Sequence, residues 1–309
     1  MKNKKVLVVL GGTSGEREIS FQSGRACIKA LKKLGYQVST FDPKKKPLNL
    51  IDKKKVDVIF NALHGKDGED GVAQSYFEYL RIPYTHSGVI SSYNAMNKVI
   101  SKEIFKKKKI RSPNYLIIEK GFYSKEKLIS LIKKNNVSFP LVIKPISEGS
   151  SIGVHICKNI LHLLKASSFL FRKYKELIIE TYIPGQEIQV AVINNFPLGA
   201  IELKPKRKFY DYKAKYSKAA KTEHIMPANL KKTEYRKVLK IAKKAHLALG
   251  CKGVTRSDFK FFKNRFYILE TNTQPGMTSL SLVPEIAKFK GISFENLVEK
   301  ILLNASINR

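Results

Sequence analysis

The sequence has few cysteines and no pattern that would pair them. Cys27, Cys157 and Cys251 lie far apart, and none belongs to a CxxC or Cys–His spacing. This distribution argues against a disulfide framework and against a structural zinc site. We therefore expect three free thiols that are buried or semi-buried.

Long apolar runs are also missing. A run such as VLVVL at 6–10 is far shorter than the ~20 residues that a membrane span needs. It follows MKNKK, but it is also shorter than the roughly 7–15 apolar residues of a signal-peptide core, and the following GEREIS has no small-residue cleavage pattern. We expect a cytoplasmic protein that does not enter a membrane.

Acidic residues are scarce beside basic ones, 25 Asp and Glu against 58 Lys and Arg, which gives a formal net charge of +33. Such a charge raises the hypothesis of nucleic-acid binding, because lysines release counterions from phosphate backbones. The lysines, however, are spread along the whole chain, and no zinc-finger, RNP-type or basic-zipper pattern accompanies them. We expect weak non-specific adhesion at most and no specific nucleic-acid partner.

Strands and helices alternate through the first third of the chain, which is typical of a small doubly wound α/β unit. The expected elements are a buried strand at 4–10, a helix over 20–34 closed by Gly35, strands over 37–41 and 56–63, and a helix from about 72 to 80.

The pattern changes near residue 91, where a lysine-rich helix runs to about residue 109. Strand patterns follow at 113–119, 139–145 and 177–183, and Pro184-Gly185 after them is a plausible hinge. A chain of 309 residues is long enough for two or three domains. We predict three, over 1–92, 93–183 and 184–309.

Two glycine-rich turns follow strands in the first third. VLVVLGGTSGEREIS (6–20) carries Glu16, and ALHGKDGEDG (62–71) carries His64 and Glu69, at the sheet edge where α/β folds bind ligands. A glycine turn after a strand often cradles phosphate. A carboxylate within it repels phosphate, however, and suits an ammonium group.

The sharpest signal is RSDFKFFKNRFYILETNTQPGMTSLS (256–281). Its two β-rich segments flank a turn-like triplet, 263–265, so we predict a hairpin in which Asp258 lies opposite Glu270, with Asn272 on the same face. Two carboxylates and an amide oxygen suit Mg²⁺. The alternative, a solvated hairpin with incidental charges, is disfavoured because the acids lie within an apolar run.

Neighbouring residues could supply positive charge to such a metal site. Arg256 shares the face of Asp258, and Pro275-Gly276 leaves a backbone N–H free, a combination that suits a developing oxyanion. Lys98 and Lys144 are candidate phosphate clamps, and the SEGSSIG loop (147–153) lets backbone donors approach phosphate.

The polar stretch at 204–227 is too long for an ordinary connection and is predicted to be a lid loop. Three tyrosines in eight residues favour a lid that docks on the protein. Within it, Lys215 could reach a phosphate and Tyr216 a nucleophile.

Taken together, these motifs resemble the D-alanine–D-alanine ligases of the ATP-grasp superfamily. The resemblance runs over essentially the whole chain and depends on seven segments in matching order: LGGTSGEREIS, ALHGKDGEDG, the Pro83–Gly88 segment, VIKPISEGSSIG, FYDYKAKY, GVTRSDF and LETNTQPGMTSLSLVP. It implies an ATP-grasp fold of mixed α/β and α+β class with three domains, in which ATP is held between the central and C-terminal domains. It also implies a homodimer.

The resemblance implies a reaction. ATP phosphorylates the carboxylate of one D-alanine, the amine of a second D-alanine attacks the acyl phosphate, and the dipeptide, ADP and phosphate are released for peptidoglycan precursor synthesis. The first glycine loop is then an amino-acid site. The residues implied for the two amino acids are Glu16 with His64 for the first ammonium, Arg256 and the Gly276 N–H for the oxyanion, Ser281 and Leu282 for the second carboxylate, and Ser150 and Tyr216 in a hydrogen-bonded set with Glu16.

A second group of residues is implied for ATP and metal. Lys98 and Lys144 hold the α- and β-phosphates, Lys215 the γ-phosphate, Glu180, Thr181, Tyr182 and Ile183 line the adenine, Glu187 binds the ribose, and Ser151 joins the ATP set. Asp258, Glu270 and Asn272 carry two Mg²⁺ ions, for which Mn²⁺ can substitute.

Some residues depart from the usual family pattern. Thr271 and Gln274 replace the customary Ala and Ser of the metal strand, and Ser257 stands where an aliphatic residue normally separates Arg256 from the following aspartate. Lys213 and Lys218 make the lid unusually basic. None of these changes removes an expected ligand.

Two alternatives remain open at this stage. One is a related ligase with D-lactate or D-serine as its second substrate, although the YDYKAKY lid resembles the dipeptide-forming group. The other is a non-catalytic nucleotide- or nucleic-acid-binding protein on the same scaffold. That alternative predicts the loss of at least one of Asp258, Glu270, Asn272 and Arg256, and all four are present.

Overall fold

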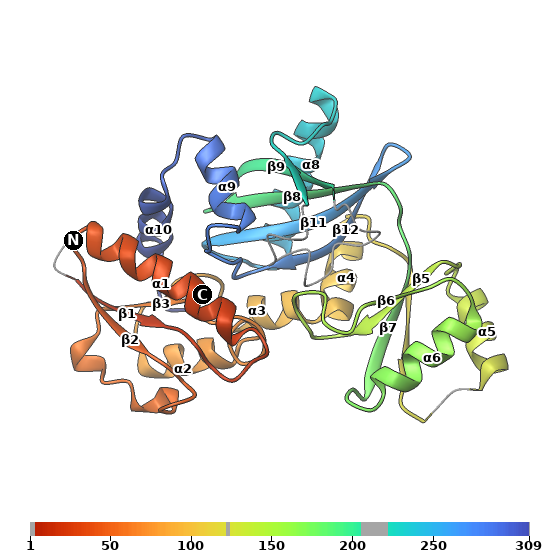
Figure 1. Cartoon of the computed structure of the whole chain (residues 1–309), viewed down its shortest axis with the longest axis horizontal. Coiled ribbons are helices and arrows are strands. Elements are labelled where there is room, and N and C mark those ends of the chain that lie inside the picture. Colours follow the sequence, from red (N-terminus) through yellow and green to blue (C-terminus); the bar gives the residue numbers. More distant parts are fainter. Residues whose placement is uncertain (1–3, 122–123, 205–221, 309) are drawn as a thin grey trace.

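The computed structural model describes residues 4–121, 124–204 and 222–308. Its chain forms three β-sheets, and Figure 1 shows the five-stranded sheet between the three-stranded sheet at one end and the four-stranded sheet at the other. Within the described ranges, no helix is both long enough and apolar enough to span a bilayer. The predicted lid lies mostly in 205–221, outside the described residues.

The first sheet is parallel, with β1 (Lys5–Val9) between β2 (Gln37–Phe41) and β3 (Val58–Asn61). It is accompanied by α1 (Arg17–Lys33) and α2 (Val72–Leu80). The expected doubly wound unit is confirmed, although α1 begins three residues before the predicted start. Two short 3₁₀ turns, Leu48–Leu50 and Lys53–Lys55, connect β2 to β3.

The second sheet is antiparallel, in the order β4-β7-β5-β6. Apolar side chains of α5 and α6 pack with those of the strands in one core whose members all lie between residues 116 and 179. The elements are β4 (Tyr115–Glu119), α5 (Lys125–Lys134), β5 (Leu141–Pro145), β6 (His155–Cys157), α6 (Ile160–Leu170) and β7 (Glu176–Thr181).

The third sheet is antiparallel, in the order β10-β9-β8-β11-β12, and is covered on both faces. Along β8, Ile188, Val190 and Val192 belong to the core formed with α8, whereas Ala191 and Ile193 belong to the core formed with α9 and α10, as the period of two requires. The elements are β8 (Gln186–Ile193), β9 (Phe196–Lys204), β10 (Glu223–Ile225), α8 (Lys232–Ala248), β11 (Val254–Phe262), β12 (Arg265–Asn272), α9 (Leu282–Phe289) and α10 (Phe294–Leu303).

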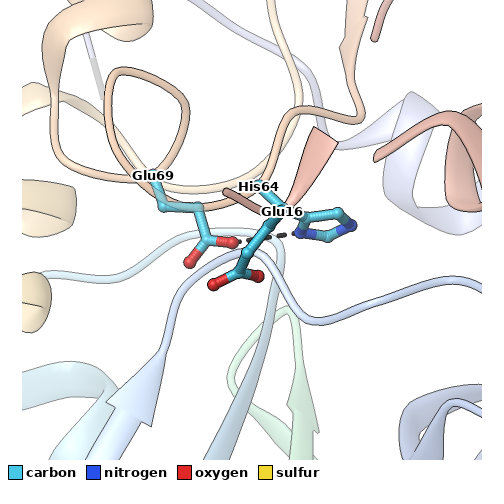
Figure 2. Close-up of side chains that lie close together, drawn as sticks. All are labelled: Glu16, His64 and Glu69. Atoms are coloured by element: carbon cyan, nitrogen blue, oxygen red, sulfur yellow. Dashed lines mark hydrogen bonds and ion pairs between the residues drawn. The ribbon is translucent and has the colours of Figure 1, made fainter. Parts of the chain in front are cut away.

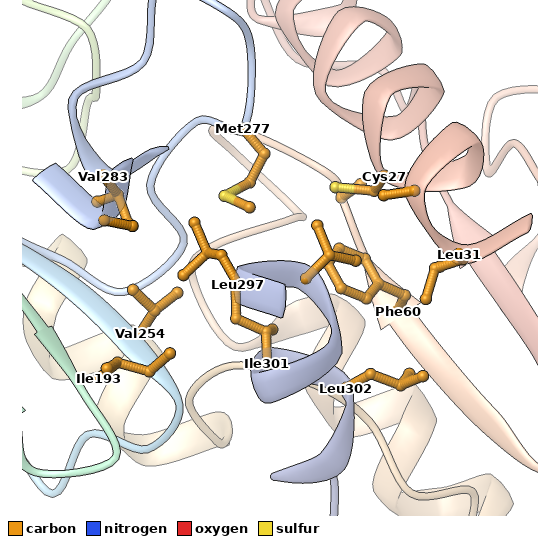
Figure 3. Close-up of a cluster of buried hydrophobic side chains, with 14 of the residues drawn as sticks. Cys27, Leu31, Phe60, Ile193, Val254, Met277, Val283, Leu297, Ile301 and Leu302 are labelled. Atoms are coloured by element: carbon orange, nitrogen blue, oxygen red, sulfur yellow. The ribbon is translucent and has the colours of Figure 1, made fainter. Parts of the chain in front are cut away.

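One apolar core joins the first sheet to the third. Figure 3 shows Phe60 and Leu31 of the N-terminal unit packed with Leu297 and Ile301 of α10, which in turn face Val254 of β11. Burial of each such side chain stabilises the fold by about 1.5–3 kcal/mol. The C-terminal helix therefore fastens these two sheets to each other, whereas the second sheet has a core of its own.

The lysine-rich helix predicted after residue 91 is two helices, α3 (Val89–Met96) and α4 (Lys98–Lys107). Asn97 separates them, because its extended backbone ends α3 and its side chain accepts hydrogen bonds from the backbone N–H groups of Val99 and Ile100 at the start of α4. Lys98 thus becomes the first residue of a helix. The predicted domain boundary at 92 falls inside α3 and stays a prediction, as does the boundary at 183.

Candidate active site

Two adjoining cavities lie where the three sheets meet. The first and larger one is lined by residues of the second and third sheets, among them Lys144, Glu180 and Asp258. The second is lined by both glycine turns and by residues of β11 and β12, among them Arg256 and Asn272. Lys98, Glu148 and Glu270 line both cavities. The two spaces therefore share a wall, as a site that transfers a group between two ligands requires.

The hairpin of β11 and β12 places its acids as predicted. Asp258 pairs with Glu270, and Arg256 pairs with Asn272. The turn itself is shorter than expected, since Phe262 pairs directly with Arg265, and a β-bulge between Asp258 and Phe259 restores the predicted alignment. Asp258 is buried, whereas Glu270 and Asn272 are half-buried and remain accessible from the cavities.

The oxygen donors of this hairpin fit the chemistry of a Mg²⁺ site. In the structure they are engaged by the protein itself. Arg256 forks onto Asp258, with Nε donating to Oδ1 at 2.7 Å and Nη2 donating to Oδ2 at 3.0 Å. The Oδ1 of Asn272 accepts a hydrogen bond of 2.7 Å from the backbone N–H of Gln274. Arg256 is predicted to stabilise the oxyanion. In the structure it instead neutralises the charge of Asp258, which is a predicted metal ligand.

Both lysines predicted to clamp phosphate reach the first cavity and are also held by acceptors of the protein. Lys98 donates to the backbone oxygen of Glu148 at 2.6 Å, and its Nζ lies 3.8 Å from Oε2 of Glu270. Burial lowers the pKa of Lys98, and the Glu270 carboxylate opposes that shift. Lys144 on β5 lies 2.9 Å from Oε2 of Glu180 on the neighbouring strand β7.

The residues predicted around the nucleotide base line the same cavity. Thr181, Tyr182, Ile183 and Glu187 follow one another along its wall, and Ser151 lies in the wall formed by the 147–153 loop. Glu187 forms an ion pair of 2.9 Å with Lys260, a lysine that the sequence analysis did not single out. Lys260 follows Asp258 by two residues on β11 and therefore shares its face, which is the signal that the sequence offered.

A carboxylate-rich pocket forms at the two glycine turns. Figure 2 shows Glu16, His64 and Glu69 converging, and one ligand atom of each lies within 4.8 Å of the others. His64 contacts Oε1 of Glu69 through Nδ1 and Oγ of Ser23 through Nε2, both at 3.0 Å. Both ring nitrogens are therefore used inside the protein, which favours a site for an ammonium group over a metal site.

The charge of this pocket depends on His64. Burial alone would lower the pKa of His64, yet the Glu69 carboxylate raises it overall above its ordinary value. Glu16 is 5% exposed and lines the second cavity from the opening loop. The Glu16 carboxylate also contributes to raising the pKa of His64.

The SEGSSIG loop lies directly against Glu16. A Cβ at Gly149 would stand 2.7 Å from Oε1 of Glu16, so a larger residue at this position would displace the Glu16 carboxylate. Ser150, the next residue, has a positive φ of 51° and lines the same cavity as Glu16. The structure therefore brings two of the three members of the predicted Glu16–Ser150–Tyr216 set together. Tyr216, Lys215, Lys213 and Lys218 lie outside the described residues.

Gly276 and Ser281 meet at the far side of the second cavity. A Cβ at Gly276 would stand 2.9 Å from Oγ of Ser281, and Gly276 lines the cavity. Ser281 precedes α9 and accepts a hydrogen bond of 2.9 Å from the backbone N–H of Thr278. Leu282 is buried, with its side chain in the core shared by the first and third sheets. Its side chain therefore packs rather than facing the cavity.

Two of the departures from the family pattern hydrogen-bond to each other. Ser257 and Thr271 are paired across the hairpin, and their hydroxyl oxygens lie 2.9 Å apart in a buried position. Gln274 accepts a hydrogen bond of 2.8 Å from the Asn61 side chain and donates to the backbone oxygen of Leu63. It therefore ties the hairpin to the end of β3.

We expect Ser257→Ala to lower the free energy of unfolding by about 1–3 kcal/mol, because it removes the partner of the buried Thr271 hydroxyl. Adding Thr271→Val, which removes the second hydroxyl at nearly constant volume, should recover most of that loss. Urea unfolding of both single variants and the double variant measures the coupling. A double variant as unstable as the sum of the two single variants contradicts the pairing.

The sequence analysis also missed Lys102. This lysine lies one turn beyond Lys98 on α4, is fully buried, and its Nζ lies 3.1 Å from Oε1 of Glu180. The signal was present, since residues four apart on a helix share a face. Lys102 is one of many lysines in the chain, however, and its local sequence does not distinguish it from the others.

The first cavity lies between two antiparallel sheets, with lysines on one wall and paired acids on the other. This arrangement defines an ATP-grasp architecture. The comparisons with known proteins agree with this assignment. The family described as D-ala D-ala ligase N-terminus matches residues 41–87, and the family described as D-ala D-ala ligase C-terminus matches residues 104–303. The chain belongs to the D-alanine–D-alanine ligase family, which confirms the resemblance inferred from its motifs.

Individual relatives match over nearly the whole chain. A D-alanine–D-alanine ligase of Pelagibacter ubique is 56% identical over 310 residues, covering 99% of each sequence. The crystal structure of the Bacillus anthracis D-alanine–D-alanine ligase superposes with a TM-score of 0.87 at 34% identity, covering 97% of each chain. A structure described as a Bacillus anthracis D-alanine–D-alanine ligase complexed with ATP gives a TM-score of 0.83 at 29% identity, again over 97% of each chain.

Proposed function

We propose that this protein joins two molecules of D-alanine into D-alanyl-D-alanine with ATP as co-substrate, for the synthesis of peptidoglycan precursors. A carboxylate oxygen of the first D-alanine attacks the γ-phosphorus of ATP and ADP leaves. The amine of the second D-alanine then attacks the acyl phosphate, loses a proton, and phosphate leaves. The observation that carries the proposal is the shared wall of the two cavities, because it puts the pocket that we assign to the ammonium group beside the pocket that we assign to phosphate.

The first D-alanine is assigned to the pocket at the glycine turns. Glu16 receives its ammonium group, with His64 nearby, because Glu16 is a buried carboxylate that lines the cavity. Arg256 and the Gly276 N–H stabilise the oxyanion that develops when the amine attacks.

ATP is assigned to the larger cavity. Lys98 and Lys144 serve the α- and β-phosphates, Glu180 to Ile183 line the adenine, and Glu187 binds the ribose, which agrees with their places in the cavity wall. Ser151 joins the same set, and Lys215 of the lid takes the γ-phosphate. Asp258, Glu270 and Asn272 would hold two Mg²⁺ ions, replaceable by Mn²⁺, whose charge offsets that of the phosphate oxygens.

The second D-alanine is assigned to the start of α9. Ser281 and Leu282 take its carboxylate; for Leu282 this must involve the backbone, because the side chain lies in the core. Ser150 and Tyr216 complete a hydrogen-bonded set with Glu16 that positions the amine and the lid at 204–227. We retain the division into 1–92, 93–183 and 184–309, each part containing one sheet.

The protein is proposed to be a cytoplasmic homodimer. Support for the dimer comes from α2 and α3, which contact each other and expose apolar side chains: Val72 (42%), Tyr76 (41%), Tyr79 (79%), Ile90 (67%) and Tyr93 (50%). An exposed apolar patch often marks an interface. Sedimentation of the purified protein tests this, and a stable monomer at micromolar concentration contradicts it.

The deciding experiment measures ADP release with ATP, Mg²⁺ and D-alanine, with identification of the amino-acid product. We expect D-alanyl-D-alanine, and no ADP release above background when L-alanine replaces D-alanine. Offering D-lactate or D-serine with D-alanine, from about pH 6 to pH 8, tests the second substrate. A depsipeptide or a mixed D-alanyl-D-serine as the main product overturns the proposed specificity.

A further inference from the structure

The carboxylate of Glu180 lies between two ammonium groups. Its Oε2 is 2.9 Å from Nζ of Lys144, and its Oε1 is 3.1 Å from Nζ of Lys102. All three side chains are buried, with exposures of 9% for Lys144, 3% for Glu180 and 1% for Lys102. Oε1 accepts no well-directed hydrogen bond, so its contact with Lys102 is an ion pair.

Two lysines on one acid leave an excess positive charge in a buried place. Burial lowers the pKa of Lys102 to about 8, against the opposing pull of Glu180. Burial would by itself raise the pKa of Glu180, but Lys102 and Lys144 together hold it below its ordinary value. At neutral pH Glu180 is therefore an ionised carboxylate, and it depends on its lysines to remain so.

The two lysines differ in where they can go. Lys144 lines the nucleotide cavity, on the strand beside Glu180. Lys102 lies behind Glu180 on α4, with Nζ 5.7 Å from the ring centre of Tyr115 and 3.5 Å from the backbone oxygen of Pro113. Lys144 can turn toward a ligand in the cavity, whereas Lys102 is confined against the acid.

We propose that Lys102 is a positioning residue that keeps Glu180 ionised and in place while Lys144 moves from Glu180 to the phosphates of the nucleotide. This inference rests on the proposed function, which gives Lys144 to phosphate and Glu180 to the adenine. When Lys144 leaves, Oε2 of Glu180 is freed toward the cavity while Oε1 stays on Lys102. Without Lys102, the same movement would leave a buried carboxylate unpaired, which is strongly unfavourable.

The freed oxygen has a defined chemical preference. An ionised carboxylate only accepts hydrogen bonds, so it favours a base edge that presents an amino group. Adenine carries an amino group at that edge, and hypoxanthine carries a carbonyl oxygen in its place. A protonated Glu180 would instead donate to the carbonyl. Lys102 therefore affects the preference for adenine over hypoxanthine without contacting the base itself.

The other charged groups around Glu180 are the same in the wild type and in variants of Lys102. Lys98 faces it from the first turn of α4, and Tyr115 faces Glu180 from β4 with its hydroxyl donating to Glu103 at 2.6 Å. None of these side chains is altered by a substitution at residue 102, so a change in base preference reports on the ion pair.

The test compares the dissociation constants of ATP and ITP, measured with the full chain in Mg²⁺ and without amino acids. We expect Lys102→Met, which keeps the length of the side chain and removes its charge, to weaken ATP binding about 10-fold to 100-fold and ITP binding much less. Lys102→Arg should preserve most of the preference for ATP. Lys106→Met, an exposed lysine one turn further along α4, is the matched control.

Proton linkage gives a second measurement. From about pH 7.5 down to pH 6, ATP affinity of Lys102→Met relative to the wild type should rise, because Glu180 of the variant takes up a proton when Lys144 leaves. If Lys102→Met does not fold, Lys102→Gln, which also removes the charge, gives the same test. Wild-type protein that binds no ATP overturns the proposed function. An unchanged preference and pH profile in the variant overturns only the role of Lys102.

Discussion

Replacing Glu270 by Gln is expected to lower the rate of ADP release by about 10³-fold or more, with the protein still folded. Glu270 is opposite Asp258 on the hairpin, lines both cavities, and lies 3.8 Å from the Lys98 ammonium. Glutamine keeps the size of the side chain but removes the negative charge that a divalent cation needs. Losing one preorganised charge at a phosphoryl-transfer site has effects of this order.

The variant is compared with Glu119→Gln, an exposed glutamate at the end of β4, an edge strand of the second sheet. Circular dichroism and thermal unfolding check the fold of both proteins, and ADP release is followed over a range of Mg²⁺ and Mn²⁺ concentrations. We expect the Glu119 variant to match the wild type. Near-normal ADP release from Glu270→Gln at ordinary Mg²⁺ concentrations would refute the metal assignment.

The second large effect is expected at the amino-acid pocket. Glu16→Gln should lower kcat/KM for the first D-alanine by about 10²-fold to 10³-fold, while the affinity for ATP stays within a few-fold. Glu16 is buried, so its carboxylate interacts with an ammonium group at low dielectric, and an uncharged amide leaves that ammonium desolvated without a counterion. ATP is assigned to the other cavity, and Glu16 is not among the described residues that line it.

Initial rates at varied D-alanine, together with a separate ATP-binding measurement, distinguish this effect from general damage to the site. Glu18→Gln is the matched control, because Glu18 lies two residues further along in the exposed first turn of α1. If Glu16→Gln weakened ATP binding as much as D-alanine use, the pocket at the glycine turns would not be an amino-acid site.

Local periodicity explains why much of this architecture could be predicted. The strand at 37–41 and the helix at 72–80 have the predicted ends, and the face shared by Asp258, Glu270 and Asn272 follows from the alternation of side chains along a strand. The glycine turns could be identified because their polar residues come directly after buried strands. These features each depend on a few neighbouring residues.

The features that could not be predicted depend on distant parts of the chain. The bulge between Asp258 and Phe259 is a property of the pairing of two strands, and no single residue in the sequence marks it. The fork of Arg256 on Asp258 and the burial of Lys102 against Glu180 require elements to be packed before the contacts exist. The start of α4 at Lys98 could have been predicted from the sequence, because asparagine is strongly favoured at the N-cap and Asn97 directly precedes Lys98.

The apolar core that joins α10 to both α1 and the five-stranded sheet has a mechanical consequence. A shared apolar core joins two of the three sheets into one structural unit. The four-stranded sheet has an apolar core of its own and meets that unit across the cavity assigned to the nucleotide. We expect any closing motion around the nucleotide to rotate residues 115–181 against these two sheets, and to carry Gly149 and Ser150 of the second cavity with them. Solution scattering with and without nucleotide would register that rotation as a decrease in the radius of gyration.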